Sequence, residues 1–227
     1  MEHKAFTWFG LLPGPENVMA AGLVAGLLLA FAAFVHPRLA ATEEAIAPEE
    51  GVTARNLAEV FVESISGLTE GAIGHGYERY VSLLAAFFAF ILVSNLIGLV
   101  PGFAPPTSDF NITLALGFVS FVAYHAAGMR EHGLGYLRQF LGSVVFLYPL
   151  MLVVELFTHL FRPVSLAIRL FANMTADHEV VTIFTGLTHA VIPVAFYVLG
   201  AFVAVVQAFI FTMLSAIYIA LAVSHEH

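Results

Sequence analysis

The chain of 227 residues contains no cysteine, and only 11% of its residues are charged. Without thiols it can form neither disulfides nor thiolate metal sites, although this absence does not fix the cellular compartment. Hydrophobic residues make up 60% of the chain, whereas a soluble domain is about half apolar and about a quarter charged. This composition is typical of a polytopic membrane protein.

Basic residues are also scarce, with 8 Lys and Arg against 16 Asp and Glu and a net charge of −8. A nucleic-acid-binding protein needs a basic patch, so nucleic acid is not an expected partner. The sequence contains neither a GxxxxGK[ST] loop nor an HExxH motif, and its histidines show no paired spacing typical of a zinc site. We therefore expect no cofactor and no metal, in a single membrane domain spanning residues 1–227.

Apolar runs predict the membrane spans. Residues 18–35 carry no charge, and at about 1.5 Å per residue they are just long enough to cross a bilayer of about 30 Å. A cleaved signal peptide is the competing interpretation, but the run is long and its leader is not clearly basic, so we expect a retained span. Further spans are predicted at 81–100 and 110–129, joined by the Gly- and Pro-rich turn GLVPGFAPPTSD.

The segment between the first two spans is more polar. Residues 36–56 are predicted as a loop, and residues 57–75 as an amphipathic helix whose apolar stripe is Leu57, Val60, Phe61, Ile65 and Leu68. This helix is too polar to cross the bilayer, and we expect it to lie along the membrane surface. A peripheral helix that packs on the bundle is the alternative.

Apolar character then continues for about 80 residues after Phe140. The one good turn signal is GLTHAVIP, so two long helices over 140–187 and 191–223 are a simpler division than four short ones. Each exceeds the approximately 20 residues of an upright span, so both should tilt or bend, with the prolines as candidate bends. The expected fold class is an all-α polytopic membrane protein with about five transmembrane helices and one interfacial amphipathic helix.

The arginines of the loops predict the orientation of the chain. Cytoplasmic loops are enriched in Lys and Arg near the span ends. With five crossings and one surface helix, one side of the membrane receives Arg38, Arg55, Arg79, Arg130 and Arg138. The other side receives only Lys4. The N-terminus is therefore predicted outside and the C-terminus inside.

A polar line runs through the apolar segment ELFTHLFRPVSLAIRLFANMTADHE, residues 155–179. Glu155, Arg162 and Arg169 recur every seven residues, so on a helix they project within about 40° of one another. Asn173 follows Arg169 by one turn on the same face. Charges at membrane depth are expensive and mark ion pathways.

The chemistry of these groups predicts a proton path. Arginine keeps its proton at physiological pH, whereas carboxylates and histidines can exchange theirs. Arg169 would therefore be a fixed positive charge, with Glu155 about 21 Å away along the axis. On the other side, His178 and Glu179 lie about 14 Å away by the same rise. This arrangement is a barrier with a titratable relay at each end.

Simpler alternatives exist for several of these side chains. Arg162 could snorkel to the headgroups, and His159 could be an interfacial residue. The triplet at 177–179 could be a helix-end cluster in water. Gln207 and Ser215 could bridge helices by hydrogen bonds.

Four segments, in order along the chain, resemble one family. They are SNLIGLVPGF, SDFNITLAL, RPVSLAIRLFANM and VQAFIFTMLSAIYIALA. They are similar to the motifs of subunit a of the rotary F-type ATP synthase, the membrane stator that faces the ring of c subunits. The resemblance covers the chain from about residue 57 to the C-terminus, and it implies that the last two helices form a tilted hairpin against the c-ring.

The resemblance also implies roles for individual residues. Arg169 matches the stator arginine that faces the carboxylate of each passing c subunit, and Gln207 and Asn173 match the polar residues close to it. Glu155, with Ser165 nearby, matches the acid of the cytoplasmic half-channel. These residues would conduct protons between the ring and the cytoplasm.

The outer half-channel departs from the family pattern. Bacterial members commonly have glutamate at the position of His178, paired with a histidine at the position of Gly200. Asp109 matches the acid of the outer loop. The outer relay is therefore predicted to be rebuilt around Asp109, His178 and Glu179.

The implied function is a non-catalytic proton-channel subunit that couples proton flow to rotation and ATP synthesis. Its implied partners are the c-subunit ring, the b-subunit peripheral stalk, the other ATP synthase subunits and membrane lipid, and its implied location is a bacterial inner membrane. A stand-alone ion-coupled secondary transporter is the alternative, although no internal repeat is visible. An intramembrane hydrolase would need a catalytic constellation, and the histidines here are scattered.

Overall fold

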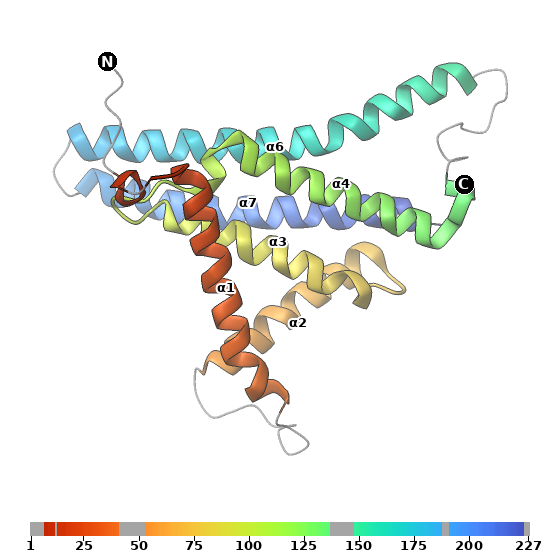
Figure 1. Cartoon of the computed structure of the whole chain (residues 1–227), viewed down its shortest axis with the longest axis horizontal. Helices are drawn as coiled ribbons and strands as arrows, with labels where there is room; N and C mark the ends of the chain where they lie inside the picture. The colour runs from red at the N-terminus through yellow and green to blue at the C-terminus, as the bar shows by residue number, and fades with distance from the viewer. Residues whose placement is uncertain (1–6, 12, 41–52, 137–147, 188–190, 225–227) are drawn as a thin grey trace.

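A computed structural model describes residues 7–11, 13–40, 53–136, 148–187 and 191–224. Every regular element in these residues is a helix (Figure 1). The elements are η1 (Trp8–Leu11), α1 (Glu16–Ala40), α2 (Ala54–Ile73), α3 (Glu78–Ile97), η2 (Pro106–Ser108), α4 (Phe110–His132), η3 (Gly133–Gly135), α6 (Tyr148–Leu187) and α7 (Val191–Val223). All the α-helices named except α2 are long and apolar enough to cross a membrane. The prediction of an all-α polytopic membrane protein with about five spans is confirmed.

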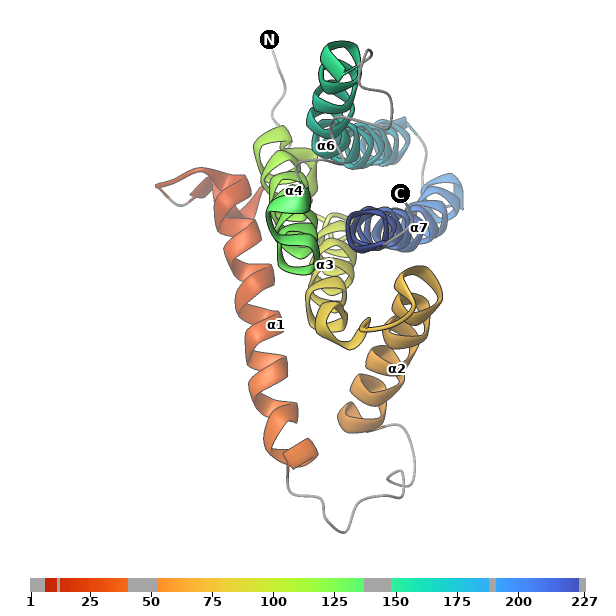
Figure 2. The ribbon, with the colours of Figure 1, turned by 90° about the vertical axis from the view of Figure 1, so that its right-hand side faces the viewer.

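Helices α3, α4, α6 and α7 form a bundle, and α1 crosses it steeply (Figure 1). Helix α7 packs against α2, α3, α4 and α6, while α4 also packs along α6. The view turned by 90° shows α3 and α4 between α1 and α7 (Figure 2). The main core cluster contains Ile65, Leu84, Phe87, Ile91, Leu166, Leu170, Met174, Ala208, Phe211 and Ala216. A buried hydrogen bond of 2.8 Å from Ser120 to Ser215 bridges α4 and α7.

The first helix is longer than the predicted span. α1 extends from Glu16 to Ala40 and contains Pro37, so the residues predicted to begin the loop are still helical. The loop prediction for the arginines is wrong in the described residues, because these arginines lie near helix ends: Arg38 in α1, Arg55 in α2, Arg79 in α3 and Arg130 in α4. Lys4 and Arg138 lie outside the described residues, and the orientation of the chain stays a prediction.

Helix α2 begins three residues before its predicted start and ends two before its predicted end. Thr53 caps it, because its hydroxyl oxygen accepts a hydrogen bond of 3.2 Å from the Asn56 N–H. Gly74 ends it with a φ of 77°, a conformation that favours glycine. The helix packs against α1, α3 and α7, which agrees with the alternative of a peripheral helix on the bundle. Its position at a membrane surface stays a prediction.

The turn between α3 and α4 is fixed at both ends. α3 runs three residues earlier than predicted, from Glu78 to Ile97, and α4 begins at Phe110 as predicted but continues to His132. Asp109 caps α4, since its Oδ1 accepts a hydrogen bond of 2.7 Å from the Asn111 N–H. Its Oδ2 accepts a second bond of 2.9 Å from the Asn17 side chain and thereby ties α1 to α4.

The last two helices form the predicted hairpin. α6 has 40 residues and α7 has 33, whereas an upright span needs about 20. Residues 140–147 of the first predicted helix lie outside the described residues. α6 changes direction along its length (Figure 1), and Pro163 inside it supplies the physical cause. Both long helices cross the direction of α1 steeply, so they would lie strongly tilted where α1 spans a membrane upright.

Candidate functional site

Arg169 and Arg162 lie on the same helix but have different surroundings. Arg169 is exposed, and it makes no hydrogen bond or ion pair with the described residues. The Arg162 guanidinium instead lies 5.8 Å from the ring centroid of Tyr124 and 5.1 Å from that of Tyr218. Cation–π attraction to these two rings holds Arg162 against α4 and α7 rather than extending it toward headgroups.

The polar residues predicted close to Arg169 lie on both helices of the hairpin. Asn173 is half-buried on α6, and Gln207 is buried on α7 with 8% of its surface exposed. Ser165 is exposed on α6. The helices α6 and α7 pack against each other, and the closeness of Gln207 to Arg169 stays a prediction.

Toward the N-terminal end of α6, which is predicted to be the inner end, Glu155 lies close to a histidine. Its Oε2 lies 3.7 Å from Nε2 of His159. Ser165, the predicted neighbour of Glu155, is ten residues further along, or about 15 Å by helical rise. His159 was interpreted as an interfacial residue, but only 15% of its side chain is exposed. The structure therefore adds His159 to the inner set.

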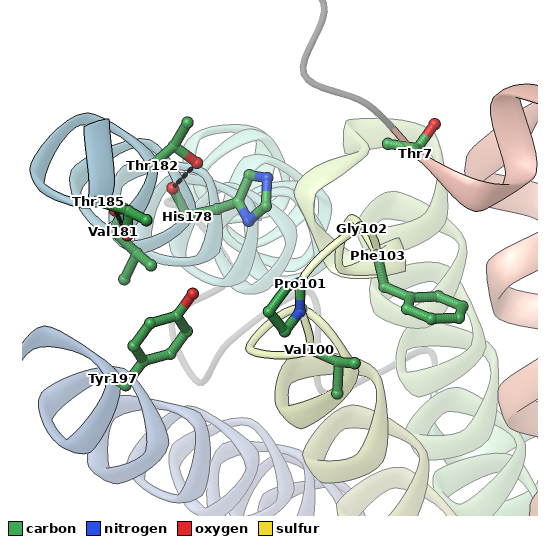
Figure 3. A pocket seen from close by; sticks show the side chains of 11 residues that line it. Thr7, Val100, Pro101, Gly102, Phe103, His178, Val181, Thr182, Thr185 and Tyr197 are labelled. Carbon is green, nitrogen blue, oxygen red and sulfur yellow. Dashed lines mark hydrogen bonds between the residues drawn. The ribbon is translucent and has the colours of Figure 1, made fainter. Parts of the chain in front are cut away.

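Toward the C-terminal end of α6, which is predicted to be the outer end, His178 lines a cavity of about 160 Å³. The cavity lies between α6, α7 and the turn after α3, and the Tyr197 hydroxyl and the His178 ring face it (Figure 3). The Thr182 hydroxyl, also lining it, donates a hydrogen bond of 2.8 Å to the His178 carbonyl. The lining is mainly apolar, and its polar side chains include His178, Thr182, Thr185 and Tyr197. These are the groups to which water in the cavity could bind.

A narrower space continues from this cavity toward Asp177. The two spaces share Gly98, His178 and Val181, and the second reaches Asp177 and Asn95. Asn95 is held in place, because its Oδ1 accepts a hydrogen bond of 2.6 Å from the Thr107 hydroxyl. Its amide donates to the Ala204 carbonyl at 3.4 Å.

Gly200 leaves room for the Asp177 carboxylate. A Cβ atom at Gly200 would lie 2.6 Å from Oδ2 of Asp177. The position that seemed empty in the sequence is therefore occupied by a carboxylate from the facing helix. Asp177 was absent from the predicted site, yet it lies four residues after Asn173 and eight after Arg169, a helical spacing that could have identified it.

Glu179 and Asp109 are not brought to these spaces. Glu179 is exposed on α6, and neither residue is among those lining the two cavities. The hydrogen bond from the Asn17 side chain holds the pKa of Asp109 below its ordinary value, and backbone N–H groups of α4 add to this effect. Asp109 is therefore an anionic cap and anchor in this structure.

The fold and these residues define a polytopic helical membrane protein with a fixed intramembrane charge between two sets of titratable groups. Such groups mark ion pathways. A family described as ATP synthase A chain matches residues 18–220. The chain therefore belongs to the ATP synthase A chain family.

Three relatives illustrate the similarity. ATP synthase subunit a of Bdellovibrio bacteriovorus is 38% identical over 228 residues, which cover 98% of this chain and all of the relative. The protein of the same name from Citrifermentans bemidjiense is 41% identical over 189 residues, 83% of this chain and 82% of the relative. ATP synthase subunit a 1 of Syntrophotalea carbinolica is 43% identical over 173 residues, 76% of this chain and 74% of the relative.

Proposed function

We propose that this chain is the stator subunit of the membrane sector of a rotary ATP synthase. One observation carries the proposal at the level of residues: Arg169 is exposed on the hairpin and makes no ion pair or hydrogen bond with the described residues. A fixed positive charge within an apolar span is expensive unless an anion faces it. A carboxylate supplied by each passing subunit of a c-ring would be that anion.

The outer half-channel begins at the cavity lined by His178 and Tyr197. A proton entering there would pass His178, reach Asp177 and neutralise a c-ring carboxylate. Glu179 and Asp109 lie outside this route. The proposed outer relay therefore differs from the one predicted from the sequence, because Asp177 replaces them as the acid.

The inner half-channel begins on the other side of Arg169. After the ring has turned, its proton would leave past Ser165 and Glu155. Arg169, which never loses its charge, would prevent direct transfer between the two half-channels, and Asn173 and Gln207 would be the uncharged polar groups of this part of the hairpin. Each charge that crosses yields about 2.3 kcal/mol per 100 mV, so several protons must combine to make one ATP.

The proposed partners follow from this role. The α6–α7 hairpin would face the c-ring, and the b-subunit stalk and the other ATP synthase subunits would complete the complex. Large apolar side chains of α1, such as Leu27, Leu29 and Phe34, are more than half exposed and would face lipid or neighbouring helices. The subunit would itself catalyse no nucleotide chemistry. It would reside in a bacterial inner membrane with its N-terminus outside.

Replacing Arg169 by alanine tests the proposal. Inverted membrane vesicles carrying the whole complex would be assayed for ATP-driven acidification, with assembly checked in parallel. We expect Arg169→Ala to abolish pumping by an intact complex. Arg130→Ala is a matched control, because Arg130 is an exposed arginine at the end of α4, and it should pump normally. Normal pumping by Arg169→Ala would contradict the proposal.

A further inference from the structure

Pro163 changes the hydrogen bonding of one backbone carbonyl of α6. A proline has no N–H, so Pro163 cannot donate the usual helical hydrogen bond to the carbonyl of His159, four positions earlier. The Tyr124 hydroxyl on α4 lies 3.4 Å from this carbonyl oxygen. The same hydroxyl lies 3.1 Å from Nδ1 of the His159 ring.

This geometry gives Tyr124 two alternative acceptors for one proton. In a neutral imidazole with a bare Nδ1, the hydroxyl donates to Nδ1. When Nδ1 carries a proton, that N–H can donate to the hydroxyl oxygen, and the hydroxyl can turn to the carbonyl. Both states keep the buried Tyr124 hydroxyl hydrogen-bonded. His159 can therefore gain and lose a proton without leaving the buried Tyr124 hydroxyl unsatisfied, which would be costly.

The other ring nitrogen faces an acid. Nε2 of His159 is 3.7 Å from Oε2 of Glu155, one helical turn closer to the inner end. A small side-chain rotation or one bridging water would close this distance. A proton on Nε2 can thus move to the Glu155 carboxylate, leaving a neutral imidazole and a neutral acid.

The groups around His159 and Glu155 limit how much positive charge this pair can hold. Charged or titratable groups facing His159, directly or through Tyr124, come from α6, α4, the segment after α4 and α7, namely Glu155, Arg162, Tyr124, His125, Tyr136 and Tyr218. Arg162 contributes a permanent positive charge, so a second one on His159 is favourable only while Glu155 is ionised. The pair is suited to carry one proton at a time.

We propose that His159 is a second proton-exchanging group of the inner half-channel, acting in series with Glu155, and that Tyr124 is its positioning residue. The proposal rests on the proposed function of the chain. A proton released by the c-ring converts the neutral His159 imidazole to imidazolium. The Nε2 proton then moves to the Glu155 carboxylate, and Glu155 releases it to the cytoplasm. ATP-driven pumping reverses these steps.

The test measures the initial rate of ATP-driven acidification of inverted vesicles against the pH of the medium, which bathes the cytoplasmic face. We expect His159→Gln to lower the initial rate of acidification at least about tenfold, since positioned acid–base groups contribute this much or more. The pH profile of pumping should also shift, because the path then loses one of its two proton-exchanging groups and depends on Glu155 alone. His36→Gln, at the exposed end of α1, is the matched control and should behave as the unsubstituted complex.

Tyr124→Phe is the second variant. It keeps the ring beneath Arg162 but removes the hydroxyl, so the rate loss should be smaller and the pH shift should have the same direction. If His159→Gln does not assemble, Tyr124→Phe decides the question.

Unchanged rates and pH profiles would overturn the proposal, and so would a loss of rate with an unshifted profile, which indicates a structural role alone. In either case, inactivity of Arg169→Ala would leave the proposed function standing. Normal pumping by Arg169→Ala would instead remove the function on which the proposal rests.

Discussion

Toward the C-terminal end of α6, a glycine on α7 leaves room for the Asp177 carboxylate, whereas toward the N-terminal end His159 meets a packed aromatic cluster. These two ends are the ones proposed as the outer and the inner half-channel. A side chain at Gly200 would collide with the Asp177 carboxylate. The Tyr124 hydroxyl lies 3.4 Å from the His159 carbonyl, to which Pro163 cannot donate a hydrogen bond. A titratable side chain is therefore accommodated at one end by a missing side chain and at the other by a hydroxyl with two acceptors.

The two ends also differ in how their charge is balanced. The inner acid has a permanent positive charge within its cluster, because Arg162 is held between Tyr124 and Tyr218. The outer acid borders small and uncharged groups, among them Gly98 and Asn95. On the proposed route, a proton in the inner half-channel would move beside the fixed charge of Arg162, whereas a proton in the outer half-channel would depend on water reaching the cavity. Variants that fill or neutralise the outer space test this difference.

The largest effect is expected from the outer acid itself. Asp177→Asn keeps the size of the side chain but removes its ability to carry a proton, so ATP-driven pumping should fall about a hundredfold. Glu179→Gln is the matched control, because Glu179 is an exposed acid two residues away on the same helix. It should pump at nearly the normal rate. The opposite ranking of the two variants would return the outer relay to Glu179.

Filling the space at Gly200 should have the next largest effect. Gly200→Val would displace the Asp177 carboxylate, and overpacking of this kind costs about 1–3 kcal/mol, so pumping should fall about tenfold. Gly26→Val is a suitable control, since no atom lies within 4 Å of a Cβ added there. In an Asp177→Ala background, the same valine should add little further loss, because the side chain that it displaces is gone. Fully additive losses would show that Gly200 acts independently of Asp177.

Much of the scaffold could be predicted from the sequence, because apolar runs identify spans whatever they pack against. The helix bounds moved by a few residues where local caps decide them, as at Thr53 and Gly74. The family resemblance separated Arg169 from Arg162, but the surroundings of Arg162 could not be predicted. Its contacts with Tyr124 and Tyr218 depend on how α4 and α7 pack against α6.

Contacts between residues on different helices could not be predicted from the sequence either. Gly200 looked like a loss of chemistry in the sequence, because the carboxylate that occupies its space comes from another helix. His159 looked interfacial, because its partner Tyr124 is 35 residues away. In both cases the residue types were visible, but their partners were set by the packing of α6 against its neighbours.

The smallest effect concerns Asp109, which the structure makes an anchor outside the outer cavity. Asn17→Ala removes the 2.9 Å hydrogen bond to its carboxylate, so the pKa of Asp109 should rise toward its ordinary value. A depressed pKa stabilises the folded protein above the pKa of the unfolded chain, and this contribution is lost as the pH falls through the folded value. The variant should therefore lose about 1 kcal/mol or less of stability at neutral pH, and the difference should vanish in acid.

Infrared titration of the carboxyl group would measure the rise in the pKa of Asp109, with Asp109→Asn as the spectral blank. Thermal unfolding of the purified complex at neutral pH would measure the change in stability. Because Asp109 lines neither outer cavity, ATP-driven pumping by Asn17→Ala should keep its rate and its pH profile. A shifted pH profile of pumping would instead place Asp109 in the proton path. The turn between α3 and α4 would then belong to the outer half-channel and would not be only its anchor.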